Sequence, residues 1–332
     1  MKTITLGKDL TVGAVGLGCM GFSHAYGPAT DEHEAAKLLR EAYDMGYRFF
    51  DTAEVYGTSD DPHVNERIVG EVLHDVRSDV VIASKFGLRF DFDSDAVPLP
   101  LIPDSRPETI RKSVEGSLRR LKTDHINLYF QHRIDPAVEP EAVAQVMSDL
   151  IKEGKITHWG ISEANEDYLR RAHAVCPVTA IENRYSMMAR HHAALFPVLK
   201  ELNIGFVAFS PMANGFLTGA YGKGQTFDAK TDYRAGMPQF TDEAVEKNRA
   251  LIELLRDTAA SHNATPAQIS LAWMIDRPEH VVPIPGSRKP ERMRENLAAA
   301  DVNLTADEIA ALDAALDGME MSAVFGGTAL KK

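Results

Sequence analysis

The stretch that decides the fold is "GYRFFDTAEVYG", residues 46–57. Its apolar run, 47–50, reads as a buried strand, and a carboxylate, Asp51, stands at the end of that run. A phenol, Tyr56, follows in the next few residues beside a glycine. In barrels of parallel strands, catalytic groups lie where the strands end. The stretch therefore predicts a strand that carries an acidic group, and then a phenol, to one end of a sheet.

Seven other short apolar or β-branched runs accompany this one along the chain. Together the eight runs cover residues 14–20, 47–53, 80–86, 126–132, 156–162, 178–185, 205–211 and 280–286. Runs of this kind are typical of parallel strands that are buried on both faces. Amphipathic stretches with helical spacing lie between them, at 31–46, 106–122, 140–154, 165–175, 195–203, 265–276 and 289–301. These alternations, without an obvious linker, predict one α/β domain over residues 1–332, a (β/α)8 TIM barrel.

Several segments are additional to the eight repeats. "TITLG" and "LTVG" near the start predict an N-terminal hairpin. Two extra helices are predicted at 242–263 and 306–318. Two long loops, 87–105 and 212–240, follow predicted strands, so we expect both at the C-terminal face of the barrel. Loops of this length are often lids or binding loops, and disorder without a role is the alternative.

Composition limits the classes of function. The net charge of −12 argues against a nucleic-acid partner, since phosphate binding needs a basic face. Only two cysteines occur in 332 residues, which favours a reducing, cytoplasmic compartment over a disulfide framework. The first residues lack the apolar core of a signal peptide. No apolar run approaches the roughly 20 residues of a membrane span, so no membrane association is expected.

The segment "GLGCMG", residues 16–21, matches G-x-G-x-x-G. That pattern marks a Rossmann fold only when a helix opens directly after it. Here "FSHAYGP" follows, and Gly27 and Pro28 block a helix until about Thr30. The glycines instead predict tight turns and close backbone approach at the mouth of a strand. A nicotinamide cofactor can still bind by another route.

Two more titratable residues stand at predicted strand ends, Lys85 in "VVIASKFG" and His132 in "LYFQHRID". Each has an ordinary explanation when taken alone: an aspartate can cap a helix, a lysine can lie on the surface, and a histidine can be structural. Together with Asp51 and Tyr56 they place four different titratable groups at one barrel mouth. That combination favours a catalytic site with no metal.

The chemistry of these four groups is coherent. A free tyrosine has a pKa of about 10, too high for efficient proton donation near neutrality. The ammonium of Lys85 would favour the phenolate of Tyr56 and lower that pKa, and Asp51 would keep the lysine charged and oriented. His132 would hydrogen-bond a substrate carbonyl oxygen. The set suits protonation of an oxygen while a hydride, which no side chain supplies, reaches its carbon.

These residues make the chain resemble the aldo-keto reductases, over almost its whole length. "GYRFFDTAEVYG" is similar to the family's first signature, and "QHRID" to a segment of its long-chain bacterial and plant-type branch. "GFVAFSPMANGFLTG" and "IPGSRKPERMRENL" are similar to its two cofactor segments. The resemblance implies a barrel that binds NADP(H) without a Rossmann domain. It also implies a catalytic tetrad of Asp51, Tyr56, Lys85 and His132, with Tyr56 as general acid for reduction of an aldehyde or ketone.

The same resemblance implies the cofactor contacts. They are Cys19, Met20, Asp51, Ser162, Glu163, Glu182, Phe209, Ser210, Pro211, Met212, Asn214, Gly215, Gly286, Ser287, Arg288, Arg292, Glu295 and Asn296. Ser162 and Glu163 are implied at the nicotinamide carboxamide. Glu163 and Glu182 stand where an amide is common in the family, and an ionised carboxylate can accept the carboxamide NH₂ but cannot donate to its oxygen. Phe209 keeps a stacking face where many members have tyrosine.

Arg288 and Arg292 point to the phosphorylated form of the cofactor. Arginine suits bidentate contact with phosphate, and a local basic cluster is informative in an acidic chain. The resemblance implies that both meet the 2′-phosphate of the adenosine ribose, so NADP should be preferred over NAD. A solvated helix start is the alternative explanation.

A small carbonyl compound is the expected partner, but the sequence leaves its identity and the oligomeric state open. The candidate substrate contacts are Phe22, Tyr26, Tyr56 and His132, together with the two long loops and the tail 319–332. Apolar residues in these segments, among them Leu101 and Phe325, hint at an apolar or aromatic substrate.

Two other functions are compatible with parts of the pattern. One is a lyase barrel that uses an uncharged Lys85 as a Schiff-base nucleophile, although the cofactor-like segments argue against it. The other is a regulatory subunit that binds NADP(H) as a redox sensor, since an intact tetrad does not exclude that role.

Overall fold

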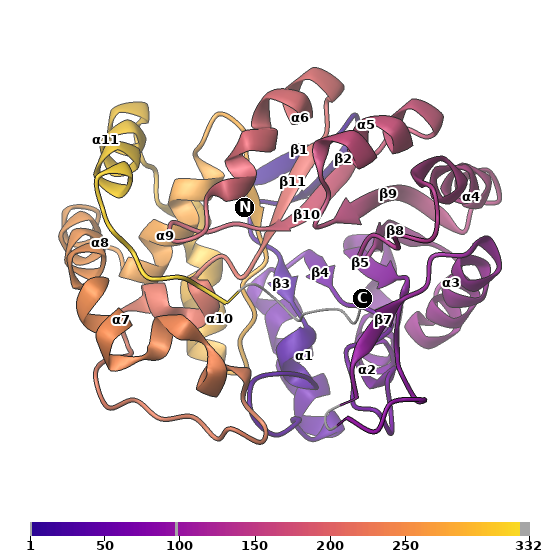
Figure 1. Ribbon diagram of the computed structural model, residues 1–332, viewed down its shortest axis with the longest axis horizontal. Coiled ribbons are helices and arrows are strands. Elements are labelled where there is room, and N and C mark those ends of the chain that lie inside the picture. The colour runs from indigo at the N-terminus through magenta and orange to yellow at the C-terminus, as the bar shows by residue number, and fades with distance from the viewer. Residues whose placement is uncertain (1, 97–98, 326–332) are drawn as a thin grey trace.

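Eight parallel strands form the central sheet of the protein, which is described at residues 2–96 and 99–325 by a computed structural model. The strands are β3 (Leu17–Gly18), β4 (Phe49–Asp51), β5 (Val81–Phe86), β8 (Ile126–Gln131), β9 (Ile156–Ser162), β10 (Ala180–Arg184), β11 (Gly205–Phe209) and β12 (Val282–Pro283). Each pairs in parallel with its neighbours, in the order β12-β11-β10-β9-β8-β5-β4-β3. The predicted (β/α)8 TIM barrel is confirmed, with the strands at the centre of Figure 1.

The first and last strands meet through a few backbone atoms. The N–H of Gly16, the residue directly before the two-residue strand β3, donates to the Pro283 carbonyl at 3.0 Å. A Cβ atom on Gly18 would lie 2.8 Å from the carbonyl oxygen of Ile284, which is closer than side chains approach. Glycine at this position therefore lets the two edges of the sheet come together. This close approach is the role expected for the glycines of "GLGCMG".

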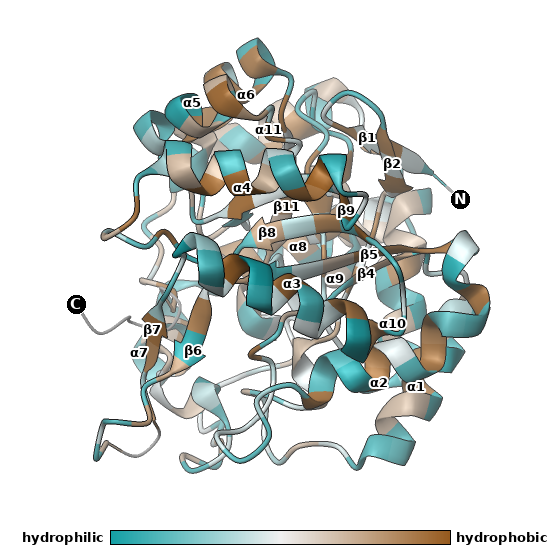
Figure 2. Ribbon diagram, turned by 90° about the vertical axis from the view of Figure 1, so that its right-hand side faces the viewer, coloured by the Kyte–Doolittle hydropathy of each residue, from teal (hydrophilic) through white to brown (hydrophobic). Residues whose placement is uncertain are grey.

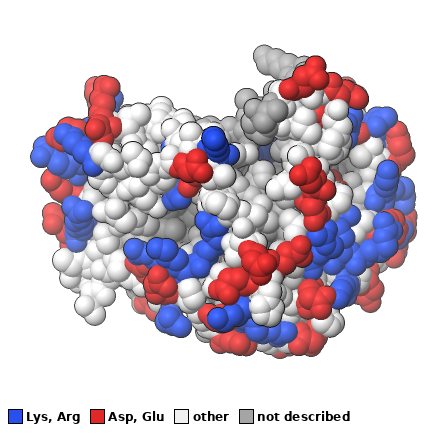
Figure 3. Space-filling view, turned by 90° about the horizontal axis from the view of Figure 1, so that it is seen from below, with Lys and Arg blue, Asp and Glu red and all other residues white. Residues whose placement is uncertain are grey.

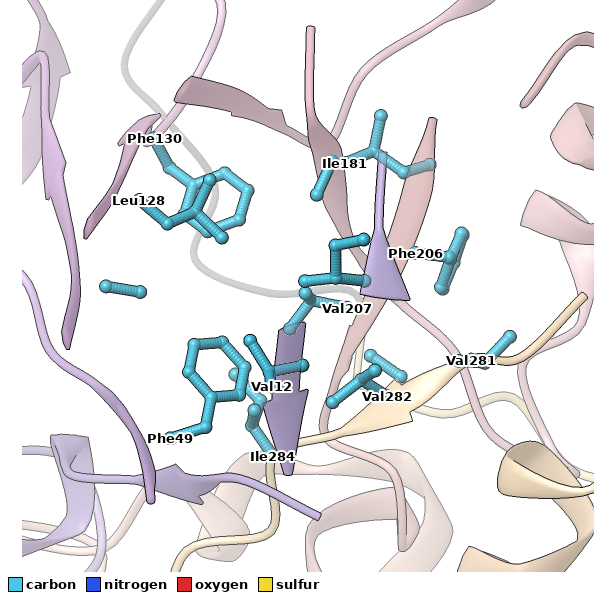
Figure 4. Close-up of a cluster of buried hydrophobic side chains, with 14 of the residues drawn as sticks. Val12, Phe49, Leu128, Phe130, Ile181, Phe206, Val207, Val281, Val282 and Ile284 are labelled. Atoms are coloured by element: carbon cyan, nitrogen blue, oxygen red, sulfur yellow. The ribbon is translucent and has the colours of Figure 1, made fainter. Parts of the chain in front are cut away.

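Side chains from the strands fill the inside of the barrel. Figure 4 shows Phe49, Leu128, Phe130, Val207 and Val282 pointing into one buried cluster, and all five have no exposed surface. Such filling makes the barrel a packed core rather than a pore. The reacting groups can consequently gather only at an end of the barrel.

Eight helices follow the strands and surround the sheet (Figure 1). They are α1 (Glu32–Met45), α2 (Val64–Leu73), α3 (Pro107–Leu121), α4 (Pro140–Lys152), α5 (Glu166–Val175), α6 (Phe196–Leu202), α9 (Pro266–Ile275) and α10 (Pro290–Leu297). Seven match the predicted amphipathic stretches. Helix α2 was not predicted, because its buried face includes the polar residues Asn65 and Glu66, which weaken the apolar periodicity.

The predicted extra helix at 242–263 is two helices, α7 (Asp242–Lys247) and α8 (Arg249–Ser261), which are separated at Asn248. The Asn248 amide donates to Ser322 Oγ at 2.7 Å and its oxygen accepts from the Ser322 N–H at 3.0 Å. This pair ties the chain beyond the other predicted extra helix, α11 (Ala306–Asp317), to the α7–α8 junction. All three helices lie on the left side of Figure 1.

Two antiparallel hairpins lie at opposite ends of the barrel (Figure 2). The predicted N-terminal hairpin, β1 (Thr3–Leu6) with β2 (Leu10–Gly13), is confirmed. Its Leu6 packs against Gly205 at the start of β11, so it covers the N-terminal ends of the strands. The second hairpin, β6 (Leu88–Phe90) with β7 (Leu101–Pro103), occupies the predicted loop 87–105 and was not expected. Residues 97–98 of that loop lie outside the described residues.

The loop 212–240 runs beside the segment that follows β3. It contains short 3₁₀ helices, η4 (Ala213–Thr218), η5 (Tyr233–Gly236) and η6 (Pro238–Phe240). The Gly27 N–H donates to the Thr231 carbonyl at 2.9 Å, and the Tyr233 N–H donates to the Ala25 carbonyl at 3.0 Å. The loop is therefore joined by backbone hydrogen bonds to the segment that follows β3.

The outer surface carries charges of both signs. On the face shown in Figure 3, lysine and arginine side chains are interleaved with aspartate and glutamate side chains. Ion pairs on the surface of the molecule join different elements, such as Arg40 with Asp75 at 2.7 Å and Arg111 with Glu153 at 2.8 Å. Among the helices in the described ranges, none combines the length and the apolar character needed to cross a membrane.

We expect Gly18→Ala to lower the free energy of unfolding by about 1–3 kcal/mol, because the added methyl group overpacks the closure between β3 and β12. Urea unfolding followed by circular dichroism measures the change. Gly222→Ala is the control, because a Cβ atom at Gly222 would have no heavy atom within 4 Å. Equal stability of the two variants would contradict the role of Gly18 in closing the barrel.

Candidate active site

A pocket of about 560 Å³ opens at the carboxyl ends of the strands. Small-molecule sites in proteins usually have volumes of about 300–1,000 Å³. The wall includes residues from the ends of β4, β9 and β11, from the segments that follow β3 and β12, and from the loop 212–240. Parts of the chain that are far apart in the sequence thus share one cavity, as in other barrels.

The four predicted catalytic side chains lie together at this pocket. Lys85 Nζ is 2.5 Å from Asp51 Oδ1 and donates to the Thr52 carbonyl at 3.0 Å. The same nitrogen lies 4.9 Å from the centre of the Tyr56 ring. The rings of Tyr56 and His132 meet edge to face with their centroids 5.6 Å apart. Asp51, Tyr56 and His132 line the cavity, and the ammonium of Lys85 is buried behind them.

Strand order explains this arrangement. Asp51 is the last residue of β4 and pairs in register with Ala83 of the neighbouring strand β5, which carries Lys85 two residues further on. His132 follows directly after β8, the next strand, and its N–H donates to the Phe86 carbonyl at 2.8 Å. Three adjacent parallel strands thereby deliver an acid, an ammonium and an imidazole to the same end of the sheet.

Lys85 is held in its charged form. Burial alone lowers the pKa of a lysine because it disfavours the ammonium, but the carboxyl groups of Asp51 and Glu182 outweigh burial and raise the pKa of Lys85 above its usual value. Glu182 Oε1 lies 3.3 Å from Lys85 Nζ. An amine must lose its proton to act as a nucleophile, so this environment does not support the Schiff-base alternative.

Burial raises the pKa of Tyr56 above its usual value, and the ammonium of Lys85 is the largest opposing influence. The lysine alone predicts a lowered pKa for Tyr56. The direction differs because the removal of the phenol from water outweighs the nearby positive charge. The phenol therefore keeps its proton at neutral pH, which is the form that can donate it.

Burial has the opposite effect on His132, since it lowers the pKa of the imidazole well below its usual value. The ring is therefore neutral at neutral pH, and one nitrogen can donate a hydrogen bond. His132 Nδ1 is buried without a hydrogen-bond partner in the part of the chain that the structure describes. A buried nitrogen without a partner beside a cavity is suited to a ligand oxygen.

Most of the predicted cofactor residues line the same cavity. They are Met20, Asp51, Ser162, Glu182, Phe209, Ser210, Pro211, Met212, Asn214, Gly215, Gly286, Ser287, Arg288, Arg292, Glu295 and Asn296. Tyr26, a predicted substrate contact, lines it too, and its hydroxyl accepts from the Asn214 amide at 2.7 Å. The fold thus brings the separate cofactor segments of the sequence to one cavity.

Besides Lys85, which is buried behind the wall, three predicted site residues do not line the cavity. Cys19 is fully buried below the cavity, where its N–H donates to the Asp51 carbonyl at 2.8 Å. Glu163 accepts from the backbone N–H of Arg184 at 3.0 Å, and its carboxylate faces His192 at 3.6 Å rather than the cavity. Phe22 packs in the hydrophobic core and is 2% exposed. None of the three is part of the cavity wall.

Several residues of the wall were not predicted from the sequence, including His24 and Arg133, and Tyr233 was covered only as part of the predicted contact of the loop 212–240. Arg133 follows His132 directly, and its Nη1 donates to Ser162 Oγ at 3.1 Å. His24 and Tyr233 come from different segments and lie 3.2 Å apart at His24 Nε2 and the tyrosine hydroxyl. Pairing between such distant segments leaves no local pattern in the sequence, whereas Arg133 could have been found from its neighbour.

The C-terminal tail reaches the cavity through Phe325, which lines it as the hint from the sequence suggested. The Phe325 N–H donates to Gln239 Oε1 at 3.1 Å, and its carbonyl accepts from the Arg184 guanidinium. Leu101, on β7, also lines the cavity. The remainder of the predicted tail contact, residues 326–332, lies outside the described residues.

Comparison with known proteins now gives the family. The sequence model described as "Aldo/keto reductase family" matches residues 14–317. The chain is 36% identical over 312 residues to the protein named "Probable aldo-keto reductase 1" of Glycine max, covering 93% of this chain and 87% of that protein. The chain belongs to the aldo/keto reductase family. This membership makes the protein an oxidoreductase of the carbonyl-reducing kind.

Solved structures of other aldo-keto reductases have the same fold. The glycerol dehydrogenase AKR11B4 from Gluconobacter oxydans aligns over 98% of both chains with a TM-score of 0.86 and 27% sequence identity. The holo form of the aldo-keto reductase AKR11C1 from Bacillus halodurans aligns over 99% of both chains, with a TM-score of 0.77 and 25% identity. Across the described residues of this aldo-keto reductase, no cluster of His, Cys, Asp or Glu is arranged to hold a metal ion.

We expect Lys85→Met to lower the free energy of unfolding by about 3–5 kcal/mol near pH 9, because it leaves buried carboxyl groups without their cation. Without the ammonium, those groups hold protons in the folded state that the unfolded chain releases. The loss should therefore be smaller at pH 6 and grow as the pH rises. Urea unfolding at both pH values measures it.

Lys155→Met is the matched control for that experiment. Lys155 also contacts two carboxylates, Glu115 at 2.7 Å and Glu153 at 2.8 Å, but its side chain is 32% exposed. Ion pairs of this kind contribute about 0–1 kcal/mol. A loss for Lys85→Met that matched the control, or that did not depend on pH, would contradict the electrostatic role given to Lys85.

Proposed function

We propose that this protein reduces aldehydes or ketones to alcohols with NADPH, and that Tyr56 is the general acid. The observation that carries the proposal is the position of Tyr56 and His132 at the cavity, in front of the buried pair of Lys85 and Asp51. A protonated phenol and a neutral imidazole are two hydrogen-bond donors for one carbonyl oxygen. That oxygen gains negative charge during reduction, so donors placed there beforehand stabilise the transition state.

The residues present fit an extended dinucleotide. Phe209, at the end of β11, offers a flat apolar ring to the cavity, which Glu182 of the adjacent strand β10 and Ser162 of β9, the strand after that, also line. The segment after Phe209 is conformationally strained, because Ser210, Ala213 and Asn214 have positive φ angles of 48°, 49° and 60°. Strain of this kind persists where the surrounding structure fixes a functional conformation. It supports the assignment of this segment to the cofactor.

The basic residues of the cavity favour the phosphorylated cofactor. Arg288 and Lys289, directly before α10, and Arg292, in its first turn, line the cavity together. Arg292 Nη1 now pairs with Glu295 Oε2 at 2.6 Å, and Arg288 Nη1 donates to the Pro28 carbonyl at 2.8 Å. Both guanidinium groups retain further N–H donors for a phosphate. This cluster supports NADP(H) in a protein whose net charge is −12.

In this mechanism the bound nicotinamide supplies the hydride, and the chain's own residues handle the proton. Tyr56 donates its proton to the carbonyl oxygen, and Lys85 stabilises the phenolate that results. Asp51 keeps Lys85 charged and oriented. His132 donates a hydrogen bond that aligns the carbonyl oxygen. The wall formed by Leu101 and Phe325 gives the substrate an apolar surface.

The cellular setting that we propose is the cytoplasm. Cys19 and Cys176 are both free and buried, which fits a reducing compartment.

The substrate is a small aldehyde or ketone. An assay of NADPH oxidation against a panel of aldehydes, ketones and quinones would identify it. Tight NADPH binding without turnover of any member would instead favour the redox-sensor alternative.

Tyr56→Phe should lower kcat by about 10²–10⁴-fold, the usual contribution of a general acid, while the Kd for NADPH changes little. Stopped-flow or steady-state NADPH oxidation measures the first quantity, and fluorescence titration the second. Tyr233→Phe is the control, because it removes another phenol of the cavity wall that contacts His24 rather than Lys85. Near wild-type turnover by Tyr56→Phe would overturn the assignment of the acid.

Arg288→Ala and Arg292→Ala should each raise KM for NADPH by about tenfold or more and leave KM for NADH nearly unchanged. The reason is that each removes charge-assisted hydrogen bonds, of about 1.5–3 kcal/mol, that only the 2′-phosphate can accept. Arg294→Ala is the control, because Arg294 is exposed on α10, the helix of Arg292, and is not part of the cavity wall. Equal effects on both cofactors would contradict the preference for NADPH.

A further inference from the structure

The buried ammonium of Lys85 faces two carboxyl groups instead of one. Besides Asp51 at 2.5 Å, Glu182 Oε1 lies 3.3 Å from Lys85 Nζ. The side chains of Asp51 and Glu182 are each 2% exposed. One oxygen of each, Asp51 Oδ2 and Glu182 Oε2, is buried without a hydrogen-bond partner within the described ranges. This part of the site therefore has more acceptor oxygens than its single cation can satisfy.

The charges that face Glu182 come from several elements. Lys85 on β5 supplies a positive charge, and Asp51 on β4 supplies a negative one. Tyr56, from the loop after β4, adds a phenol that interacts with all three groups. The register partners of Glu182 in the adjacent strands are uncharged, Ser162 in β9 and Val207 in β11.

Full ionisation would leave two carboxylates against one ammonium, a net negative charge on side chains that are at most 2% exposed. Buried carboxyl groups at such short range hold a proton rather than ionise together. Burial raises the pKa of Glu182, and the negative charge of Asp51 raises it further. Asp51 lies closer to the ammonium, so Glu182 is the member of the pair that keeps the proton.

Glu182 is also part of the cavity wall, which Lys85 is not. A protonated glutamic acid can both donate and accept a hydrogen bond, as the amide of a glutamine can. The proton thus removes the difficulty that an ionised carboxylate would have in donating to a carboxamide oxygen. It also leaves the cluster with one net negative charge instead of two after Tyr56 has given up its own proton.

We propose that Glu182 is a titrating carboxyl group of the reaction site that sets the balance between the two redox states of the bound nicotinamide. Protonated, it acts as a neutral partner of the cluster. Ionised, it places an uncompensated negative charge at the cavity wall and favours the oxidised ring, which carries a positive charge, over the reduced ring, which is neutral. This inference rests on the proposed NADP(H) function, and it concerns a positioning residue rather than the acid that donates the proton.

The sign of the effect follows from the ionisation. As the pH rises, Glu182 loses its proton, and the affinity for NADP⁺ should increase relative to the affinity for NADPH. The ratio Kd(NADP⁺)/Kd(NADPH) should therefore fall as the pH rises. The 2′-phosphate titrates in both cofactors alike, so its contribution cancels in the ratio. This measurement requires no turnover and no knowledge of the substrate.

The test is titration of the full-length protein with NADP⁺ and with NADPH between pH 6 and pH 9, by calorimetry or fluorescence. In the wild type, the ratio of the two Kd values should fall by about tenfold, equivalent to about one pKa unit of differential interaction. In Glu182→Gln, which keeps the size and hydrogen-bonding groups of a protonated glutamic acid, the ratio should change by less than about twofold. A ratio that is independent of pH in the wild type overturns the proposal, and that result needs no variant to fold.

Glu54→Gln is the matched control. Glu54 is another buried glutamate, 7% exposed, but its Oε1 accepts from the Gly87 N–H and Ser113 Oγ, and it does not line the cavity. In Glu54→Gln, the ratio of the two Kd values should fall with rising pH as it does in the wild type. If the ratio in Glu182→Gln also fell with pH as in the wild type, the proposal would be overturned. Failure of the parent function has a different signature, because neither cofactor would then bind. Binding of both with a flat ratio would refute only the role of Glu182.

Discussion

A fully buried ammonium needs carboxyl oxygens within hydrogen-bond distance, and Lys85 has them because two strands of the barrel direct carboxyl groups to the same point. Asp51 comes from β4 and Glu182 from β10. Carboxyl groups on strands that are not neighbours in the sheet can contact the same cation only if the sheet curls and closes. The charge on Lys85 and the closure of the barrel are thus parts of one constraint, which also fixes where the phenol of Tyr56 must lie.

Closure itself depends on small residues where the sheet edges meet. The predicted strands 14–20 and 280–286 are seven residues long, but only Leu17–Gly18 and Val282–Pro283 form ladders with their neighbours. The rest of these runs passes the opposite edge closely, and Gly16 and Gly18 leave the space for it. Apolar composition predicts that such a run is buried. It does not distinguish burial in a ladder from burial in a tight crossing.

The order of strands, most helices and the N-terminal hairpin could be predicted from the sequence, because apolar periodicity is a local signal. Helix α2 could not, since Asn65 and Glu66 are buried in a network of polar groups, where Glu66 contacts Arg120 at 2.6 Å. The tetrad was predictable from strand ends. The pKa direction of Tyr56 and the orientation of Glu163 were not, because depth of burial and side-chain direction arise only when distant segments pack.

The last part of the described chain is held by hydrogen bonds with the side chains of Asn248 and Gln239, and not by pairing with a strand of the sheet. The pairing of Asn248 with Ser322 and that of Gln239 with Phe325 hold residues 319–325 across the loop 212–240. Phe325 therefore forms part of the reaction cavity without contributing to the barrel. A substitution at Phe325 can therefore reshape this part of the wall while the packed interior of the barrel stays the same.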